Sequence, residues 1–267
     1  MILQTTAICL GQNPNPSVSL DEYIINEMEA EHFPGVATVI VKNGEIVWLQ
    51  CYGFADIENG IPVTDSTQFL LASMSKLFTG TTTMQLKEDG MLQLNNDINE
   101  YLPWPLNHPI QNTTPMTIQQ LMTHTSSIRD NWSAMSDYYG YPDPTMSLEA
   151  CMQDYFTVTG ENYNANQNFL SATPGTVFNY SNMATALNGY ITEIVSSMPF
   201  DDYCDEHIFE PLCMEKTAWH MADLDSNEVA RPYSYSNGNF IANPHYGFAD
   251  YPDGQLRSSI TDLANYM

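Results

Sequence analysis

The sequence predicts an α+β protein, and three observations carry this expectation. Residues 19–35 have the pattern of an amphipathic helix, residues 36–53 that of an antiparallel hairpin, and the chain after about residue 61 reads mainly as helices. A helix packed on an antiparallel hairpin is typical of an α+β fold, because each element must bury one apolar face. With 267 residues, the chain is long enough for one large domain with a sizeable core.

Capping and turn residues set the limits of the first two elements. Ser19 and Glu22 form a capping box for the first helix, and Pro34 ends it. The two apolar runs of the hairpin are joined by Asn43-Gly44, a pair that favours the tight turn between two antiparallel strands. We therefore expect one helix followed by two paired strands.

Five further helices are predicted from apolar spacing and from their caps. Gly90 ends the first of them, and Thr117 with Gln120 forms a capping box for the second. Their expected ranges are 73–89, 117–124, 147–156, 181–196 and 200–209. For the whole chain we expect an N-terminal tail over 1–16 and one domain over 17–267, with an all-helical region at about 61–200.

The composition limits the classes of partner. Hydrophobic residues make up 43% of the chain and aromatic residues 12%, which is typical of a globular protein. Acidic residues number 32 against 7 basic ones, so the formal net charge is -25. Such a charge disfavours nucleic acid and anionic membrane surfaces as partners. No apolar run approaches the ~20 residues of a membrane span, so we expect none.

The cysteines and the first residues bear on localisation. No Cys-x-x-Cys pair and no zinc-ligand spacing is present, so we expect neither a metal nor a cofactor. One interpretation is a disulfide between Cys204 and Cys213. The other, which is favoured, is that the cysteines are isolated thiols. Residues 1–16 are apolar and then break at Asn-Pro-Asn-Pro, like the remnant of a signal. We expect a periplasmic or secreted protein. The cysteines are Cys9, Cys51, Cys151, Cys204 and Cys213.

A serine and a lysine at the start of a predicted helix carry the first chemical signal. Ser73 and Lys76 are three residues apart, so on a helix their side chains are neighbours. A lysine amine held beside a serine can accept the hydroxyl proton and so activate the oxygen as a nucleophile. The alternative is a chance pair, and the two residues alone do not exclude it.

A second group of polar residues stands where another amphipathic helix begins. Tyr180-Ser181-Asn182 follows a Pro-Gly turn, at the start of the helix expected over 181–196. A phenol near an ammonium group can serve as general base for a serine and as acid for a leaving group. The same tripeptide recurs as Tyr235-Ser236-Asn237, but it runs into Gly238 as a hairpin turn does, so we assign that copy to a surface turn.

Ser73-Met74-Ser75-Lys76 followed by Tyr180-Ser181-Asn182 resembles the motifs of the penicillin-recognising serine hydrolases. The tyrosine is similar to that of the branch with class C β-lactamases, D-alanyl-D-alanine carboxypeptidases and related esterases. Three further segments also resemble this family, and the resemblance extends from about residue 20 to residue 267. They are "TIQQLMTHTSSI" (117–128), "IFEPLCMEKTAW" (208–219), with Cys213 in place of a family glycine, and "PDGQLRSSITDLANYM" (252–267).

The resemblance implies a β-lactamase/penicillin-binding-protein-like fold, in which an antiparallel sheet with flanking helices accompanies an all-helical region. It implies that Ser73 attacks a carbonyl to form an acyl-enzyme, that Lys76 and Tyr180 transfer its proton, and that Asn182 orients the substrate. The Ser73 N–H, at the positive end of a helix, would supply half of an oxyanion hole. His124 is a candidate triad histidine, but with Ser73 and Lys76 present we expect a structural imidazole.

The sequence departs from the family at the third motif. Family members carry Lys or His, a variable residue and Gly on a strand after the segment that resembles 252–267. This chain ends before such a strand, and His245-Tyr246-Gly247 fits the letters but stands out of order. We therefore expect the chain to lack the C-terminal strands of the fold, to expose a strand edge and to be poorly active as given.

Two classes of function remain open from the sequence. The first is a serine hydrolase that cleaves a small amide or ester, namely a β-lactam, a D-Ala peptide or a simple ester. Its partner would be a small-molecule or peptide substrate. The second is a non-catalytic relative that binds such a ligand or a partner protein without turnover. The complete set of Ser73, Lys76, Tyr180 and Asn182 favours the enzyme, because binding alone does not require all four residues.

Overall fold

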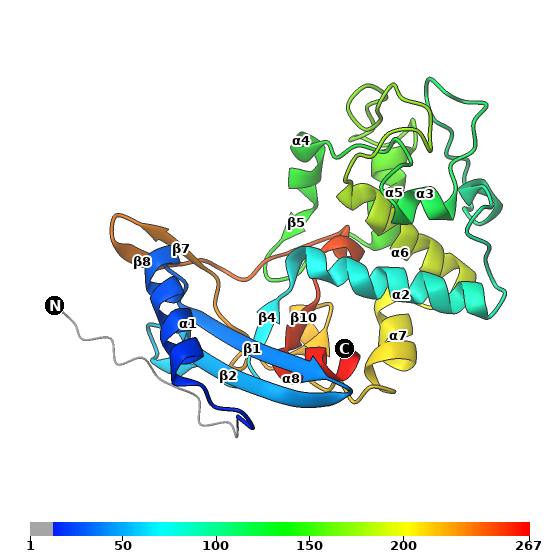
Figure 1. Ribbon diagram of the computed structural model, residues 1–267. Coiled ribbons are helices and arrows are strands. Elements are labelled where there is room, and N and C mark those ends of the chain that lie inside the picture. Colours follow the sequence, from blue (N-terminus) through cyan, green and yellow to red (C-terminus); the bar gives the residue numbers. More distant parts are fainter. Residues whose placement is uncertain (1–12) are drawn as a thin grey trace. The chain divides into compact units, whose positions relative to one another are not determined.

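The computed structural model describes residues 13–267 and has the α+β fold that the sequence predicted (Figure 1). Residues 1–12, with Cys9 and most of the expected N-terminal tail, lie outside the described residues. The chain forms two compact units. Among the described residues, a sheet-containing unit comprises residues 13–70, Phe209–His245 and Arg257–Met267, and a helical unit comprises Leu71–Ile208 and Tyr246–Leu256.

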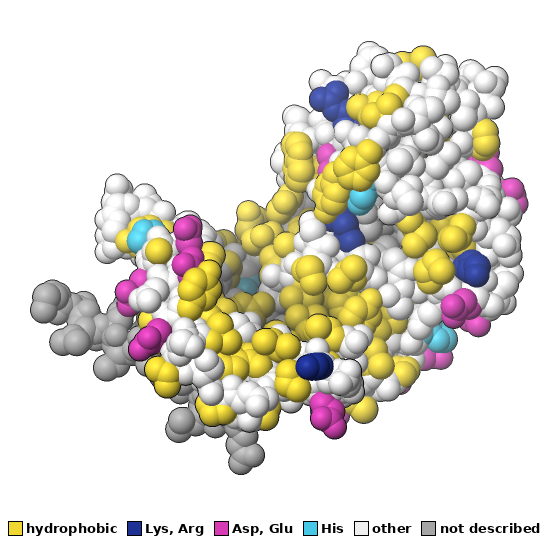
Figure 2. Space-filling view, in the orientation of Figure 1, with side chains coloured by type: hydrophobic (Ala, Val, Ile, Leu, Met, Phe, Trp, Pro, Cys, Tyr) yellow, Lys and Arg dark blue, Asp and Glu magenta, His cyan; other side chains and the backbone are white. Residues whose placement is uncertain are grey.

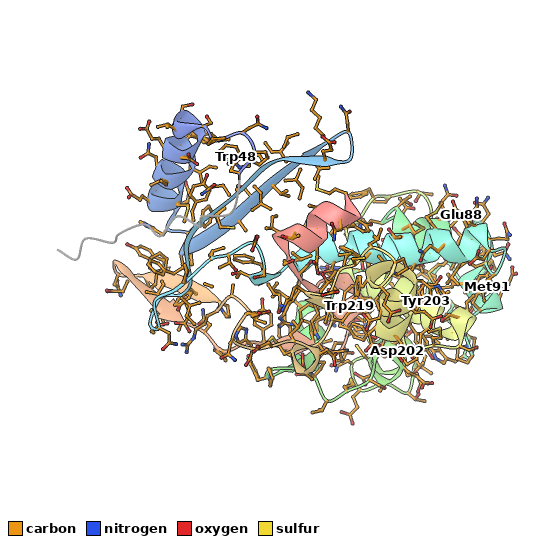
Figure 3. All side chains as sticks on the ribbon, turned by 90° about the horizontal axis from the view of Figure 1, so that it is seen from below. Trp48, Glu88, Met91, Asp202, Tyr203 and Trp219 are labelled. Carbon is orange, nitrogen blue, oxygen red and sulfur yellow. The ribbon has the colours of Figure 1, made fainter. Side chains whose placement is uncertain are left out.

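A helix and a three-stranded sheet begin the sheet-containing unit. Helix α1 (Val18–Glu31) precedes the antiparallel strands β1 (Gly35–Lys42), β2 (Glu45–Asp56) and β3 (Ile61–Pro62), in the order β1-β2-β3. The predicted hairpin is confirmed: Lys42 pairs with Glu45, and the turn residues Asn43 and Gly44 have φ of 55° and 74°. Buried Trp48 on β2 donates its indole N–H to Thr38 Oγ1 of β1 at 3.0 Å (Figure 3).

The predicted cap of the first helix is wrong by two residues. Ser17, with an extended backbone, is the N-cap, and its Oγ accepts the N–H of Leu20. Ser19 therefore lies inside the first turn and cannot close a capping box with Glu22. The helix also stops earlier than Pro34, because His32 takes a left-handed conformation with φ of 60° and turns the chain toward β1.

The rest of the sheet-containing unit consists of short elements. Strands β4 (Gln68–Leu70), β10 (Arg257–Ser259) and β6 (Thr217–Ala218) form a second antiparallel sheet in the order β4-β10-β6. Helix α8 (Ile260–Tyr266) follows β10 and lies against β1. Strands β7 (Tyr233–Ser236) and β8 (Asn239–Ala242) form a hairpin whose turn is Asn237-Gly238. The second Tyr-Ser-Asn tripeptide is therefore in a hairpin turn, as predicted.

The helical unit contains the predicted helices with small shifts at their ends. Helix α3 has the expected Thr117/Gln120 capping box, and Gly90, with φ of 75°, follows the end of α2. The α-helix expected over 200–209 stops at Cys204 and continues as a π-helical turn, Asp205–Phe209. The α-helices are α2 (Ser75–Glu88), α3 (Ile118–Met122), α4 (Trp132–Met135), α5 (Leu148–Phe156), α6 (Asn182–Ser196) and α7 (Phe200–Cys204), and the strands are β5 (Tyr139–Gly140) and β9 (Gly247–Phe248).

Helices α2 and α6 pack against each other and form the centre of the helical unit (Figure 1). Every residue of α6 from Met183 to Thr192 is buried, so this helix lies inside the unit. The two helices also share buried polar contacts: Thr82 Oγ1 lies 3.1 Å from Thr192 Oγ1, and Asn188 Nδ2 donates to Thr83 Oγ1 at 2.6 Å. These hydrogen bonds fix how the helices lie against each other, because a buried hydroxyl or amide without a partner is costly.

The described part of the chain contains no disulfide. Cys51, Cys151 and Cys204 are buried thiols outside any disulfide, and Cys213 is an exposed thiol outside any disulfide. The bridge between Cys204 and Cys213, which the sequence left open, is thus not formed, and the alternative of thiols without a disulfide applies. Within residues 13–267, no helix is long and apolar enough to cross a membrane. Basic side chains are scattered singly on the face shown in Figure 2.

The close packing of α6 on the turn Tyr251–Asp253 leads to a first prediction. A Cβ on Gly189 would lie 2.5 Å from Pro252 Cβ, so Gly189→Ala must push the rigid proline ring away. We expect it to destabilise the fold by about 1–3 kcal/mol, despite the ~1 kcal/mol by which alanine favours a helix. Thermal or denaturant unfolding measures the change.

Gly80→Ala in α2 is the matched control for this substitution. A Cβ there would meet only Met122 Cε, at 4.0 Å, so the gain in helix propensity should remain, and the variant should be as stable as the wild type or more so. If both variants unfold at the same denaturant concentration, Gly189 is not held by a close approach to Pro252.

Candidate active site

Ser73 lies in a 3-10 turn, Ala72–Met74, that leads directly into α2. The α-helix expected over 73–89 thus begins two residues later. The turn runs straight into the helix, where residues i and i+3 lie on the same face, and this brings Ser73 and Lys76 together. Ala72 has φ of 48°, a left-handed conformation that costs about 1 kcal/mol or more for a residue other than glycine. The strained residue stands directly before Ser73.

Two hydrogen bonds hold this turn against the segment that ends at Leu256. The Leu71 N–H donates to the Leu256 carbonyl at 2.8 Å, and the Leu256 N–H donates to the buried Ser75 Oγ at 3.1 Å. Ser75, the middle serine of the motif, is therefore a structural residue whose hydroxyl is already engaged. The turn that carries Ser73 is fixed from both sides.

Lys76 makes three polar contacts, and their geometry determines what its amine can do. Nζ lies 2.7 Å from Asn182 Oδ1 and 2.6 Å from the backbone carbonyl oxygen of Asp253. Both oxygens are acceptors only, so each takes one N–H of the amine. The third contact is with Ser73 Oγ at 3.4 Å. At this position a neutral amine presents its lone pair to the hydroxyl, whereas an ammonium group presents an N–H.

Tyr180 completes the group around the serine. Its Oη donates a hydrogen bond to Ser73 Oγ at 2.8 Å, and its ring centroid lies 5.0 Å from Lys76 Nζ. The side chain is 44% exposed, so a ligand can reach it. The structure thus brings together all four residues that the sequence singled out, namely Ser73, Lys76, Tyr180 and Asn182, within one unit of the fold.

Asp130 fixes the Tyr180-Ser181-Asn182 segment, and sequence reasoning missed it. Its Oδ1 accepts the Ser181 hydroxyl at 2.9 Å and the Met183 N–H at 3.2 Å, while its Oδ2 accepts the Asn182 N–H at 3.0 Å. Ser181 Oγ in turn accepts the Ala184 N–H as the N-cap of α6. A carboxylate at a helix N-terminus is favourable because it meets the positive end of the helix dipole. No local pattern in segment 125–146 indicates this role.

His124 is a structural residue, as the sequence led us to expect. Its Nδ1 accepts the backbone N–H of Ser181 at 3.3 Å, and its ring lies 4.5 Å from that of Tyr180 between centroids. Burial lowers the pKa of His124, and the positive charge of Lys76 lowers it further. A neutral imidazole with Nδ1 engaged by a backbone amide supports the tyrosine and is not aimed at Ser73.

Two buried carboxyl groups belong to the turn whose Asp253 carbonyl accepts Lys76 Nζ, and sequence reasoning singled out neither of them. Asp250 precedes the 3-10 turn Tyr251–Asp253, Asp253 is its last residue, and the two are 2% and 5% exposed. Burial raises the pKa of both carboxyl groups, that of Asp250 to about 6. Among residues 13–267, no group of three or more His, Cys, Asp or Glu side chains is placed to hold a metal ion.

The β-lactamase family model matches residues 20–267, and the chain belongs to this family. Protein flp of Staphylococcus aureus (strain MW2) is 28% identical over 257 residues, which cover 93% of this chain and 47% of that protein. The chain thus spans about half the length of the curated relatives it matches first.

Solved structures share the fold of this chain. The octameric penicillin-binding protein homologue from Pyrococcus abyssi has a TM-score of 0.70 at 27% identity, over 93% of this chain and 55% of that chain. EstCE1, a hydrolase with promiscuous acyltransferase activity, has a TM-score of 0.74 at 19% identity, over 91% of this chain and 69% of that chain, and this likeness shows the fold alone. Other structures of this fold are penicillin-binding proteins and class C β-lactamases. The family and the β-lactamase/penicillin-binding-protein-like fold that the sequence predicted are confirmed.

The two tyrosines of the repeated tripeptide give a second prediction. Tyr180→Phe removes the only hydroxyl that donates to Ser73 Oγ in the described residues, so acylation of Ser73 should slow by roughly 10²–10⁴-fold. Tyr235→Phe removes a hydroxyl from the β7–β8 hairpin, where the ring stacks on His32 at 3.7 Å between centroids, and should leave acylation unchanged. Rates of covalent labelling compare the two. Equal rates would mean that the first tripeptide is not the reactive one.

Proposed function

We propose that this chain acts as a serine hydrolase that cleaves a small amide or ester, such as a β-lactam, a D-Ala peptide or a simple ester, through an acyl-enzyme on Ser73. The observation that carries the proposal is the convergence on Ser73 Oγ of two groups that can transfer a proton, Lys76 Nζ at 3.4 Å and Tyr180 Oη at 2.8 Å. Membership of the β-lactamase family supports the reaction class.

In the first half of the proposed reaction, Ser73 Oγ forms a bond to the carbonyl carbon of the substrate. Its proton passes to the neutral amine of Lys76, whose lone pair points toward Ser73 Oγ. The carbonyl π electrons move to oxygen and then re-form the double bond as the leaving group departs. Tyr180 Oη, beside Ser73 Oγ, donates its proton to the leaving group and becomes a phenolate.

In the second half, a water molecule attacks the acyl carbon and gives a proton to the Tyr180 phenolate. Ser73 Oγ leaves and recovers its proton from the Lys76 ammonium group, so every group returns to its starting state. Asn182 has a positioning role, because its Oδ1 holds Lys76 at 2.7 Å. We assign it substrate orientation as well.

The start of α2 can stabilise the negative charge that develops on the carbonyl oxygen of the substrate. Neither Leu71, before the 3-10 turn, nor Met74, before the α-helix, supplies a side-chain cap. The Ser73 N–H therefore stands at a helix end without a capping side chain, where the dipole favours negative charge. We assign it as one oxyanion donor, in a class of interaction worth roughly 10²–10³ in rate.

Covalent labelling tests the proposal directly. A fluorophosphonate or a penicillin should add one label per chain, and peptide mapping should place it on Ser73. Ser73→Ala should abolish labelling, and Lys76→Ala should slow it by roughly 10²–10⁴-fold because the proton acceptor is lost. Unfolding curves must show that both variants fold. Label on Ser75, Ser126 or Ser181 would contradict the assignment of the nucleophile.

A substrate panel separates hydrolysis from the alternative of ligand binding without turnover. The panel consists of a chromogenic cephalosporin, a p-nitrophenyl ester and a D-Ala-D-Ala peptide, each tested with the wild type and Ser73→Ala. Turnover that depends on Ser73 identifies the substrate class. A chain that is labelled once at Ser73 but releases no product from any of the three would favour the binding protein.

A further inference from the structure

A cavity of about 280 Å³ lies in the sheet-containing unit, where the last turn of α1, the end of β2 and the β7–β8 hairpin come together (Figure 1). Its volume is close to the lower end of the range for small-molecule sites, about 300 Å³, so a compact ligand fits it best. Ser73, Lys76 and Tyr180 belong to the other unit and do not line it. The proposed reaction therefore gives no account of this cavity.

The hairpin on one side of the cavity is tied to the chain just after β2. Tyr233 Oη accepts the backbone N–H of Ile57 at 2.9 Å and donates to the Glu58 carboxylate. The guanidinium group of Arg231, just before β7, lies 3.6 Å from the same carboxylate. These contacts hold the hairpin in place, so the cavity is formed before a ligand enters. They also engage Arg231, which does not line the cavity.

Aromatic side chains supply much of the cavity wall. The Tyr235 ring stacks on that of His32 with centroids 3.7 Å apart, and it meets the Phe240 ring at 5.1 Å and an angle of 63°. Phe33 and Phe54 also line the cavity. Two rings at such an angle form a corner, and the faces of aromatic rings attract positive charge through their quadrupole. Tyr235 is 40% exposed, so a ligand can reach its ring.

The charge at the cavity is negative. Glu29, in the last turns of α1, lines it, and within the described residues no lysine or arginine does so. The Glu29 side chain is exposed and makes no ion pair in the described part of the chain. A carboxylate near the negative end of a helix dipole is unfavourable, and the last turn of α1 carries no basic residue to offset it. A bound cation would relieve this repulsion.

We propose that the cavity binds a small organic cation, specifically an alkylated ammonium group, with Glu29 as its counter-ion and Tyr235 and Phe240 as its aromatic walls. The alkyl groups make the cation less hydrated than a primary ammonium and give it apolar surface to place against Ile25 and Met28, which also line the cavity. This binding function goes beyond the proposed hydrolysis and depends on none of its residues.

A charged ligand and its neutral isostere separate cation recognition from simple apolar binding. Choline carries a trimethylammonium group, and 3,3-dimethylbutan-1-ol has the same shape with carbon in place of nitrogen. In calorimetric titrations of the full chain at about pH 8, where histidine side chains are neutral as a rule, choline should bind roughly 5- to 30-fold tighter than the alcohol. Equal affinity for the two compounds would contradict the proposal.

Two substitutions on one helix separate the site from the general charge of the chain. Glu29→Gln should weaken choline binding by roughly 3- to 10-fold and leave the binding of the alcohol unchanged, because only the charge is lost. Glu27→Gln is the matched control: it removes the same charge from α1 at an exposed position outside the cavity, and choline binding should not change. If the two variants bind choline equally, the attraction is that of the acidic chain as a whole and the proposal is wrong.

The aromatic walls are tested at Tyr235. Tyr235→Phe keeps the ring and should keep choline binding within about 2-fold, whereas Tyr235→Leu should weaken it by roughly 5- to 30-fold. Unfolding curves of both variants show whether the hairpin change affects the fold. Ser73→Ala should bind choline as the wild type does, so a failure of the proposed hydrolysis leaves this test intact. Absence of saturable choline binding to the folded wild type, or its loss in Ser73→Ala, would overturn the assignment of the cavity.

Discussion

The placement of Lys76 Nζ between two oxygens that can only accept hydrogen bonds is the constraint on which the helical unit depends. Asn182 Oδ1 comes from the start of α6 and the Asp253 carbonyl from the turn Tyr251–Asp253, more than a hundred residues from the lysine in each case. Together they use two of the three directions in which the amine can bond, and the remaining direction faces Ser73. Any movement of α6 or of the turn would change where the amine points.

The packing of the unit can be understood from this requirement. The start of α6 is held by Asp130, which binds Ser181, Asn182 and Met183, and by His124, which accepts the Ser181 N–H. The turn is held by Thr79 on one side and lies against α6 at Gly189 on the other. The long loop after α3 therefore holds the start of α6 in place, because the Asp130 carboxylate of this loop meets the positive end of that helix.

Costly features gather around Ser73. Ala72 has a left-handed backbone, Asp253 Oδ2 is buried without a hydrogen bond in the described structure, and burial raises the pKa of both Asp250 and Asp253. Elsewhere in the helical unit, the buried hydroxyl groups of Thr82 and Thr192 are paired, although Asn188 Oδ1 is buried without a hydrogen-bond partner among the described residues. Local strain and buried charge that persist in one region are typical of functional sites, where the surrounding structure must hold them against their preferred state.

Local signals determined much of the fold and part of the site. The Asn43-Gly44 turn, the capping box at Thr117 and the helix stop at Gly90 were predictable because a few neighbouring residues set each of them. The spacing of Ser73 and Lys76 was predictable for the same reason, although the serine lies in a 3-10 turn and not in the α-helix itself. The N-cap of α1 was assigned wrongly because two serines with similar local surroundings compete for it.

Tyr180 and Asn182 could be connected with Ser73 only through the resemblance to a family, since nothing in their own segment refers to residue 73. Asp130, Asp250 and Asp253 had no such signal at all. Their surroundings depend on contacts between segments far apart in the chain and on burial, which raises the pKa of both Asp250 and Asp253. The sequence by itself determined which local elements form and which serine has a lysine beside it. Only the tertiary structure decided where the lysine amine points, because that direction is set by acceptors that folding brings together.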